Sequence, residues 1–361
     1  MERRKFLKGA AIGAAGSALA APAIAQGAKT MTIVSTWPRD MPGLGVSAQR
    51  LAARITELSE GAIQTEYYAA GERVGALDVF DEVANGNSQA YIGADYYWTG
   101  KHPGLAYFTA VPFGMTFAEI NAWCAFGEGR ALWDELQDQF GLYGIPAGNT
   151  GTQAGGWFNK EIESADDLKG LKMRIPGQGG QVMSKLGAST VSLPGGQIYE
   201  NLVSGSIDAT EWVGPYNDYF MKFYEAAKYY YTGGMHEPGA QLSLTSNKSW
   251  WSSLTDTERA IISAAAAEEN AASYYEAVAL NGEYLQRLQD EQGVEVRSFN
   301  EDVWDAMGEA AMEVFEEAAA FDDLASRIND SMQKAMRQYG RGVALFEGQF
   351  VENRNRIFDI G

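Results

Sequence analysis

The feature that most constrains the fold is a repeated alternation of strand-like and helix-like segments. A β-branched run at residues 30–36 precedes helically spaced apolar residues at 46–60, and a second strand-like run follows at 62–68. A helix-like segment at 76–85 and a strand-like segment at 90–93 repeat the pattern. Because strands that alternate with helices form parallel or mixed sheets covered on both faces, the sequence predicts an α/β fold.

A second alternating unit follows, in which Gly and Pro residues separate the segments. The segments expected to be strands are 142–146, 152–158, 173–175, 190–193 and 209–212, and those expected to be helices are 179–186 and 195–204. The chain has 361 residues, which is more than one compact core usually holds. We therefore expect two lobes.

The last hundred or so residues change character and become rich in Ala and Glu. Residues 254–292 have apolar positions every three or four residues, and Thr255 to Glu258 forms a capping box that predicts a helix start. Further helices are expected at 303–321 and 322–338, with Gly340-Arg341-Gly342 breaking the last one. Such helices either brace the lobes or pack against a partner subunit, and bracing is the simpler interpretation.

The N-terminal segment has the composition of an export signal. Arg3 and Arg4 precede a small apolar run, and Pro22-Ala23-Ile24-Ala25 resembles a cleavage site. The paired arginines indicate the twin-arginine route, so residues 1–25 are predicted to be a signal peptide and the mature protein to be periplasmic. The apolar run is shorter than the roughly 20 residues of a membrane span, so no direct membrane insertion is expected.

The charge of the chain restricts its partners. The formal net charge is -19 at pH 7, and the sequence contains no basic cluster. An acidic surface repels nucleic acid, which excludes nucleic acid as a partner, and a site for an anion must supply its own positive charge. The single cysteine, Cys124, cannot form an intrachain disulfide.

The sequence contains few residues suited to enzymatic chemistry. Neither His102 nor His236 lies in a metal-binding spacing, and the nucleophile-elbow and phosphate-loop motifs are absent from the sequence. These observations disfavour a hydrolase or a nucleotide enzyme. One enzymatic alternative stays open, a periplasmic lyase or isomerase that uses Glu211 as a base on a small organic acid.

Four loops that follow predicted strands carry the candidate binding residues: Gln153, Arg174, Glu211 and Glu237. Open α/β sheets collect ligands at such positions. The planar guanidinium of Arg174 matches a carboxylate in two parallel charge-assisted hydrogen bonds, so this residue is a candidate for orienting an organic acid. The alternative for Arg174 is a structural ion pair with a carboxylate of the protein.

Two carboxylates near an anionic ligand would repel it unless a cation lies between them. Oxygen ligands from Gln153, Glu211, the Trp212 carbonyl and Glu237 suit a hard cation such as Na⁺ or Ca²⁺. The alternative is that Glu211 and Glu237 are solvated surface charges. Tyr96, Tyr97 and Trp212 are candidates for the wall of a cleft, although such rings are more often part of a core.

Several motifs in one order resemble a known family. The chain is similar to the extracytoplasmic solute receptors (DctP-like) of TRAP, or tripartite ATP-independent periplasmic, transporters, in the branch that binds 2-oxo acids and lactate with a metal ion. The motifs that carry the resemblance are residues 148–153, 155–158, 170–174, 207–215 and 236–239, together with the twin-arginine start.

The resemblance implies a two-lobed periplasmic binding protein of the α/β class, with mixed sheets, hinge strands and long C-terminal helices. We expect the ligand to be enclosed at the hinge. The expected organisation is a first lobe at 26–150 completed by about 237–280, a second lobe at 151–236 completed by about 281–325, and a C-terminal helical segment at 326–361.

The resemblance also implies roles for individual residues. Arg174 is expected to pair with the ligand carboxylate, and Asn149, Gln153, Tyr96, Tyr97 and Trp212 are expected to contact the ligand. Gln153, Glu211, the Trp212 backbone and Glu237 are expected to hold a bridging Na⁺ or Ca²⁺, with no organic cofactor. Gln241 is a possible rival for one of these contacts.

The implied function is capture of a small monocarboxylate, either a 2-oxo acid such as pyruvate or a 2-hydroxy acid such as lactate. Delivery to the small and large TRAP membrane subunits is expected to follow. A homodimer formed by exchange of the C-terminal helix, with Gly340-Arg341-Gly342 as its hinge, is a further hypothesis. A receptor for another solute class would keep the fold without an arginine clamp and a cation.

Overall fold

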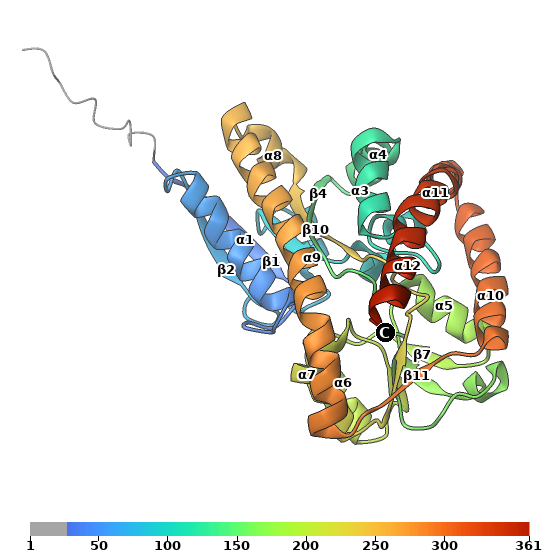
Figure 1. The fold of residues 1–361 in the computed structure, drawn as a ribbon. Helices are drawn as coiled ribbons and strands as arrows, with labels where there is room; N and C mark the ends of the chain where they lie inside the picture. Colours follow the sequence, from blue (N-terminus) through green and yellow to red (C-terminus); the bar gives the residue numbers. More distant parts are fainter. Residues whose placement is uncertain (1–26, 361) are drawn as a thin grey trace, which may run out of the picture.

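The structure is a computed structural model that describes residues 27–360. The predicted signal peptide lies outside the described residues. The chain forms two sheets, one above the other in Figure 1, with helices around both. We call the five-stranded sheet with the helices packed on it the five-strand lobe, and the six-stranded sheet with its helices the six-strand lobe.

The five-strand lobe has a mixed sheet with the strand order β2-β1-β3-β10-β4. Its strands are β1 (Lys29–Ser35), β2 (Ile63–Tyr68), β3 (Ala90–Gly93), β4 (Leu142–Asn149) and β10 (Gln241–Asn247). Strand β1 pairs in parallel with β2 and β3, whereas β10 runs antiparallel to β3 and β4. The last five residues of β1 are buried, as expected for a central strand with helices on both faces.

Helices and short 3₁₀ turns cover this sheet. They are α1 (Leu44–Leu58), α2 (Val79–Ala84), η1 (Asp95–Trp98), η2 (Pro103–Phe108), α3 (Phe117–Phe126), α4 (Gly129–Asp138) and α8 (Lys248–Ser253). The predicted strands and helices up to residue 93 are all present. The segment 94–141, in which no helix or strand was predicted, forms η1, η2, α3 and α4.

The six-strand lobe has the strand order β11-β9-β5-β8-β6-β7. Its strands are short: β5 (Gly156–Phe158), β6 (Lys172–Arg174), β7 (Ser189–Val191), β8 (Ala209–Thr210), β9 (Tyr229–Thr232) and β11 (Glu295–Ser298). Its helices are η3 (Ala165–Leu168), α5 (Gly177–Lys185), α6 (Gly195–Val203), α7 (Pro215–Met221), η4 (Phe223–Glu225) and α10 (Glu301–Ala319). The predicted α/β class with two sheets and long C-terminal helices is confirmed.

Two chain segments cross between the sheets side by side. Residues 149–155 leave β4 and enter β5, and residues 232–241 return from β9 to β10. Backbone hydrogen bonds join the two segments, from Gln153 N to Glu237 O at 3.1 Å and from Gly234 N to Gln153 O at 2.9 Å. The pairing holds the two crossing segments side by side between the lobes.

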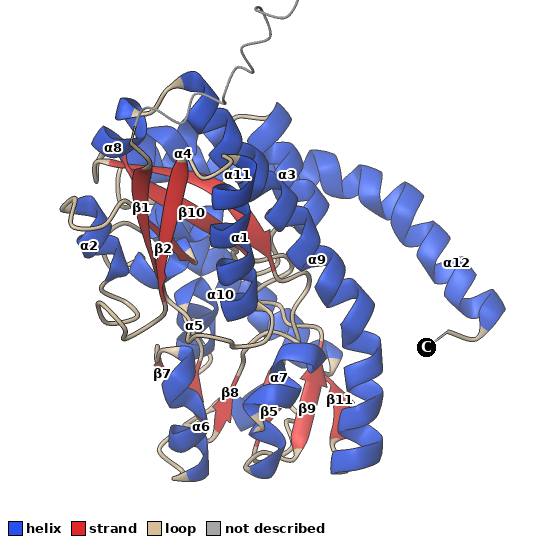
Figure 2. Cartoon of the chain, turned by 90° about the vertical axis from the view of Figure 1, so that its left-hand side faces the viewer, coloured by secondary structure: helices blue, strands red, loops and turns tan. Residues whose placement is uncertain are grey.

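Helix α9 (Asp256–Gln292) is a third connection between the lobes. Its N-terminus has the predicted capping box, because the Thr255 hydroxyl accepts from Glu258 N at 3.2 Å and the Glu258 carboxylate accepts from Thr255 N at 2.7 Å. The helix has 37 residues and is therefore about 55 Å long. It contacts α1 and β4 in one lobe and α7 in the other, so it braces both lobes (Figure 2).

The C-terminal helices differ from the sequence prediction. Helix α11 (Asp323–Val343) packs on η2, α3 and α4, passes through Gly340 and Gly342, and continues by a π-helical turn at Ala344–Gly348 into α12 (Gln349–Phe358). The predicted break at Gly340-Arg341-Gly342 is therefore wrong. Glycine costs about 1 kcal/mol in a helix interior but leaves its hydrogen bonds intact, so two glycines weaken the helix without ending it.

Helix α12 projects away from the rest of the molecule (Figure 2). Its apolar side chains and those of the preceding turn are exposed: Leu345, Phe346, Phe350, Val351, Ile357 and Phe358. Within residues 27–360, no helix has both the length and the apolar character that a membrane span requires.

Candidate functional site

Four polar side chains that the sequence singled out come together where the lobes meet. Arg174 ends β6, Glu211 follows β8, and Gln153 and Glu237 lie on the two crossing segments. Their exposed fractions are 4% for Gln153, 1% for Arg174, 1% for Glu211 and 3% for Glu237. The alternative that Glu211 and Glu237 are solvated surface charges is therefore wrong, because both carboxylates are buried.

Arg174 is held on one side and open on the other. Its Nε donates to Leu193 O at 3.1 Å, and its Nη1 donates to the carbonyl oxygen of Glu211 at 3.3 Å and to Glu211 Oε1. Its Nη2 is buried and has no hydrogen-bond partner among the described residues. A buried donor of this kind requires an acceptor, and a ligand carboxylate is one.

The ionisation of Arg174 follows from its surroundings. Burial works to lower the pKa of the guanidinium, but the charge of Glu211 and its neighbours more than offsets this, so the pKa is raised. The guanidinium carbon also lies 5.3 Å from the centroid of the Trp212 ring, which is a cation–π distance. Arg174 is therefore a permanent positive charge inside an acidic protein.

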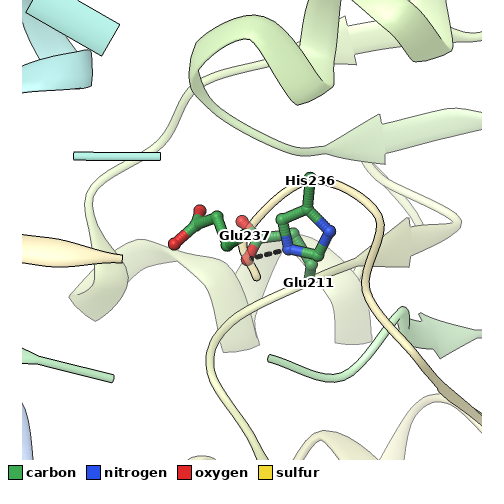
Figure 3. Close-up of side chains that lie close together, drawn as sticks. All are labelled: Glu211, His236 and Glu237. Atoms are coloured by element: carbon green, nitrogen blue, oxygen red, sulfur yellow. Dashed lines mark hydrogen bonds and ion pairs between the residues drawn. The ribbon is translucent and has the colours of Figure 1, made fainter. Parts of the chain in front are cut away.

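Both oxygens of Glu211 are engaged. Oε1 accepts from Arg174, and Oε2 lies 3.2 Å from His236 Nε2, the contact drawn in Figure 3. The alternative of a structural ion pair for Arg174 is thus present in the structure, alongside the free Nη2. The contact between β6 and β8 explains the pairing, because Arg174 is in register with Thr210, the residue before Glu211.

Glu237 has a different environment. Its Oε2 accepts from Gln153 Nε2 at 2.6 Å, and its carboxylate lies near that of Glu211. No cationic side chain of the described residues forms an ion pair with Glu237. Burial, and then the charge of Glu211, raise the pKa of Glu237 well above its ordinary value. A raised pKa means that Glu237 favours its protonated form beside Glu211, and a cation bound between the two carboxylates would favour the ionised form instead.

The donor set fits a hard cation. Gln153 Oε1 is buried and has no hydrogen-bond partner in the described chain, so one amide oxygen is available next to Glu237. Ligand atoms of Glu211, His236 and Glu237 all lie within 4.8 Å of one another. Carboxylate and amide oxygens are the ligands that Na⁺ and Ca²⁺ prefer.

The predicted aromatic residues lie around this cluster. Tyr96 and Tyr97 belong to η1 in the five-strand lobe, and their rings meet edge to face with centroids 4.8 Å apart. Burial, followed by the charge of Glu237, raises the pKa of Tyr96 well above its ordinary value. Trp212 is buried with its Nε1 unpartnered among the described residues.

Asn149 and Gln241 have structural contacts of their own. The Asn149 side chain accepts from Gly151 N at 2.9 Å and donates to Gly239 O at 3.2 Å, so it ties the two crossing segments together. Gln241 Nε2 donates to Phe108 O at 3.0 Å, while its Oε1 is buried without a partner in the described chain. Ligand contacts for both residues stay predictions.

The sequence reasoning missed His236. This residue is 4% exposed, and Gly179 of α5 packs against it so closely that a Cβ at Gly179 would lie 2.6 Å from His236 Cβ. Figure 3 shows its ring beside the Glu211 carboxylate. The one signal in the sequence was its position next to Glu237. Motifs of closely spaced metal ligands do not reveal its contact with Glu211, because Glu211 is distant in the sequence.

The chain resembles known proteins over most of its length. The family model DctP, described as bacterial extracellular solute-binding protein, family 7, matches residues 34–340. A monocarboxylate 2-oxoacid-binding periplasmic protein of Nostoc sp. is 38% identical over 346 residues, which cover 94% of this chain and 94% of that protein.

Two solved structures are also similar. A TRAP periplasmic solute binding protein from Pseudoalteromonas atlantica T6c, with bound sodium and pyruvate, is 37% identical with a TM-score of 0.87, covering 90% of this chain and 99% of that one. A TRAP transporter solute binding protein from Bordetella bronchiseptica RB50, a mixed-occupancy dimer with copurified calcium and picolinate, is 30% identical with a TM-score of 0.90, covering 92% and 98%.

Proposed function

The chain belongs to family 7 of the bacterial extracellular solute-binding proteins, and we propose that it binds a monocarboxylate 2-oxo acid such as pyruvate together with a bridging cation. The relatives with the highest identities described above bind 2-oxo acids, or pyruvate with sodium. The family is one of solute-binding proteins, not of enzymes. The bound acid is then delivered unchanged to the membrane subunits of a TRAP transporter.

One observation supports this proposal above all others. Within residues 27–360, no group accepts a hydrogen bond from the buried Nη2 of Arg174, and no group donates one to the buried Oε1 of Gln153. A small acid with a cation satisfies both, because its carboxylate accepts from Nη2 while the cation takes the amide oxygen. Because Nη1 already donates to Glu211, the ligand carboxylate accepts its hydrogen bond from Nη2.

In this proposal the cation is held by Gln153, Glu211, the Trp212 carbonyl and Glu237. When bound, the cation supplies the positive charge that two buried carboxylates and an anionic ligand share. Arg174 orients the ligand carboxylate, and Tyr96 and Tyr97 close the site from the other lobe. The enzymatic alternative, a lyase or isomerase with Glu211 as its base, is disfavoured because the family consists of solute-binding proteins.

The ligand is enclosed by movement of the two lobes. We propose that the first lobe comprises about 26–150 with 237–280, and the second lobe about 151–236 with 281–325. Tyr96 comes from the first lobe and Arg174 and Glu211 from the second, so a ligand gains contacts from both only when they are together. Bound acid and cation therefore shift the population toward the closed form.

Calorimetric titration with a panel of small acids tests the function. We expect pyruvate and related 2-oxo acids to bind in the presence of Na⁺ or Ca²⁺, with lactate as the closest competitor, and amino acids and sugars to show no heat of binding. Mass spectrometry of ligand carried through gentle purification identifies the natural acid. Conversion of pyruvate to another compound during prolonged incubation, followed by NMR, would contradict a binding protein.

Two further parts of the proposal concern location and assembly. We place the protein in the periplasm and assign its export to the twin-arginine route, for which Arg3 and Arg4 are the signal. We also propose a homodimer in which a second copy covers the exposed apolar residues of α12 and of the turn before it, which include Phe346, Phe350 and Phe358. Light scattering on the full chain and on a chain ending at Gly342 tests the dimer.

A further inference from the structure

Helix α7 of the six-strand lobe is hydrogen-bonded directly to the five-strand lobe. The side-chain nitrogen of Asn217 donates to the carbonyl oxygen of Pro42 at 2.9 Å, and Asn217 is 5% exposed. Pro42 lies in the loop before α1, next to Gly43, which is the N-cap of that helix. The hydrogen bond therefore joins a helix and a loop that are in different lobes and far apart in the sequence.

Gly43 makes this approach possible. Its φ is +71°, in the left-handed region, and a Cβ at this position would lie 2.0 Å from the side-chain nitrogen of Asn217. Any side chain at position 43 would displace the Asn217 amide and strain the backbone as well. The absence of a side chain at Gly43 therefore leaves the room that the Asn217 amide needs to reach Pro42 O.

The next residue of α7, Asp218, connects the same turn to the segment that carries Glu211 and Trp212. Asp218 Oδ1 accepts from Val213 N at 3.1 Å, and Val213 follows Glu211 and Trp212 directly. Asp218 Oδ2 also accepts from Trp157 Nε1 at 3.0 Å, which fixes the carboxylate within the six-strand lobe. The first turn of α7 therefore contacts the binding segment on one side and the other lobe on the other side.

A second, bridged link runs parallel to the first. The Tyr216 hydroxyl lies 3.3 Å from Glu276 Oε1 on α9, and Glu276 Oε2 accepts from Arg50 Nη2 of α1 at 3.1 Å. Arg50 and Glu276 are partly exposed, so this bridge contributes less than a buried contact. The buried Asn217 contact is the stronger of the two interlobe links on this side.

We propose that Asn217 is a positioning residue that holds the closed arrangement of the lobes, and that its contact with Pro42 sets the lifetime of the bound acid. The inference rests on the proposed function, since it assumes a ligand enclosed between the lobes. Asn217 stabilises the closed form through the opposite lobe rather than through the ligand. Its loss therefore speeds ligand release while association changes little, because the contact forms only once the lobes have come together.

Stopped-flow kinetics with pyruvate and Na⁺ on the full chain test the proposal. Asn217→Ala should raise the dissociation rate roughly 3- to 10-fold, the range expected for one neutral hydrogen bond, with the association rate within about 2-fold of the original. Gly43→Ala should act in the same direction from the other lobe. Asn201→Ala is the matched control, because Asn201 donates to Gln197 O at 2.8 Å within its own helix.

Small-angle X-ray scattering gives a readout that does not depend on the identity of the ligand. We expect Asn217→Ala to increase the radius of gyration of the protein without added ligand, and Asn201→Ala to leave it unchanged. Thermal unfolding shows whether each variant is folded. Unchanged dissociation rates and unchanged scattering in Asn217→Ala would overturn the role of Asn217 and leave the proposed function intact. A wild-type protein that binds no 2-oxo acid would overturn the proposed function, and the scattering comparison would then decide whether Asn217 holds the lobes together.

Discussion

Arg174 and Glu211 form a buried ion pair that occupies one side of the guanidinium, and in the described part of the chain Nη2 has no acceptor. The pair has two consequences. It compensates one of the two buried carboxylates, so Glu237 is the carboxylate that lacks a positive partner. It also keeps Arg174 in one orientation before a ligand arrives, which lowers the entropic cost of binding.

Replacement of Arg174 by lysine tests the grip on the ligand. Arg174→Lys keeps a positive charge near Glu211 but removes the planar group, so a ligand carboxylate loses its charge-assisted hydrogen bond from Nη2. Such a bond contributes about 1.5–3 kcal/mol, and we expect a roughly 10- to 150-fold loss of pyruvate affinity by calorimetry. Arg327→Lys, in an exposed ion pair with Glu135, is the control and should bind normally. A pyruvate affinity of Arg174→Lys within about 2-fold of wild type would show that Arg174 does not bind the ligand carboxylate.

Removal of the cation tests the role of the carboxylates. In a choline-based buffer without Na⁺ and with Ca²⁺ chelated, we expect pyruvate affinity to fall at least roughly 10-fold and to return when either ion is added. Glu237→Gln should weaken the dependence on the cation, because it removes one charged ligand. The matched control is Glu135→Gln at the surface. Unaltered pyruvate binding in the cation-free buffer would contradict a bridging ion between Glu211 and Glu237.

His236 should influence the cation through Glu211. Its Nε2 lies 3.2 Å from Glu211 Oε2, so His236→Ala removes a hydrogen-bond partner of a buried carboxylate at a cost of about 1–3 kcal/mol. We expect weaker cation binding in His236→Ala and a smaller loss in His236→Gln, which keeps an N–H donor. His102→Ala is the control, because His102 is the other buried histidine and pairs with Asp322. An equal loss of cation affinity in His102→Ala would show that the effect is one of overall stability.

The sequence predicted the elements better than the contacts between them. The alternation of strands and helices up to residue 93 and the start of α9 follow from local patterns, and the structure confirms them. The break at Gly340-Arg341-Gly342 was wrong, because no proline or capping residue accompanies the glycines and a helix accepts them at a modest cost. Local patterns therefore decide where elements begin more reliably than where a weak helix ends.

The pairing of Arg174 with Glu211 could not be predicted from the sequence. It depends on β6 lying beside β8 in the order β5-β8-β6-β7, with Arg174 in register with Thr210. Strand order and register are set by packing of the whole sheet, whereas the loops that carry the two residues were visible as strand ends. The same reason explains why Asn217 and Pro42, which lie in different lobes, were not singled out.

The stability of the five-strand lobe should depend on pH through Asp95. Its carboxylate is buried and accepts from Ser243, Trp133 and Gln137, yet burial raises its pKa to about 6. The unfolded chain releases this proton near pH 4, so folding takes up a proton between about pH 4 and pH 6 and the free energy of unfolding falls as the pH rises through that window, by up to about 3 kcal/mol. Asp95→Asn has no titrating group here, so urea unfolding at pH 4, 5, 6 and 7 should show a flatter profile for the variant. Parallel profiles for the two proteins would mean that Asp95 titrates alike in the folded and unfolded states.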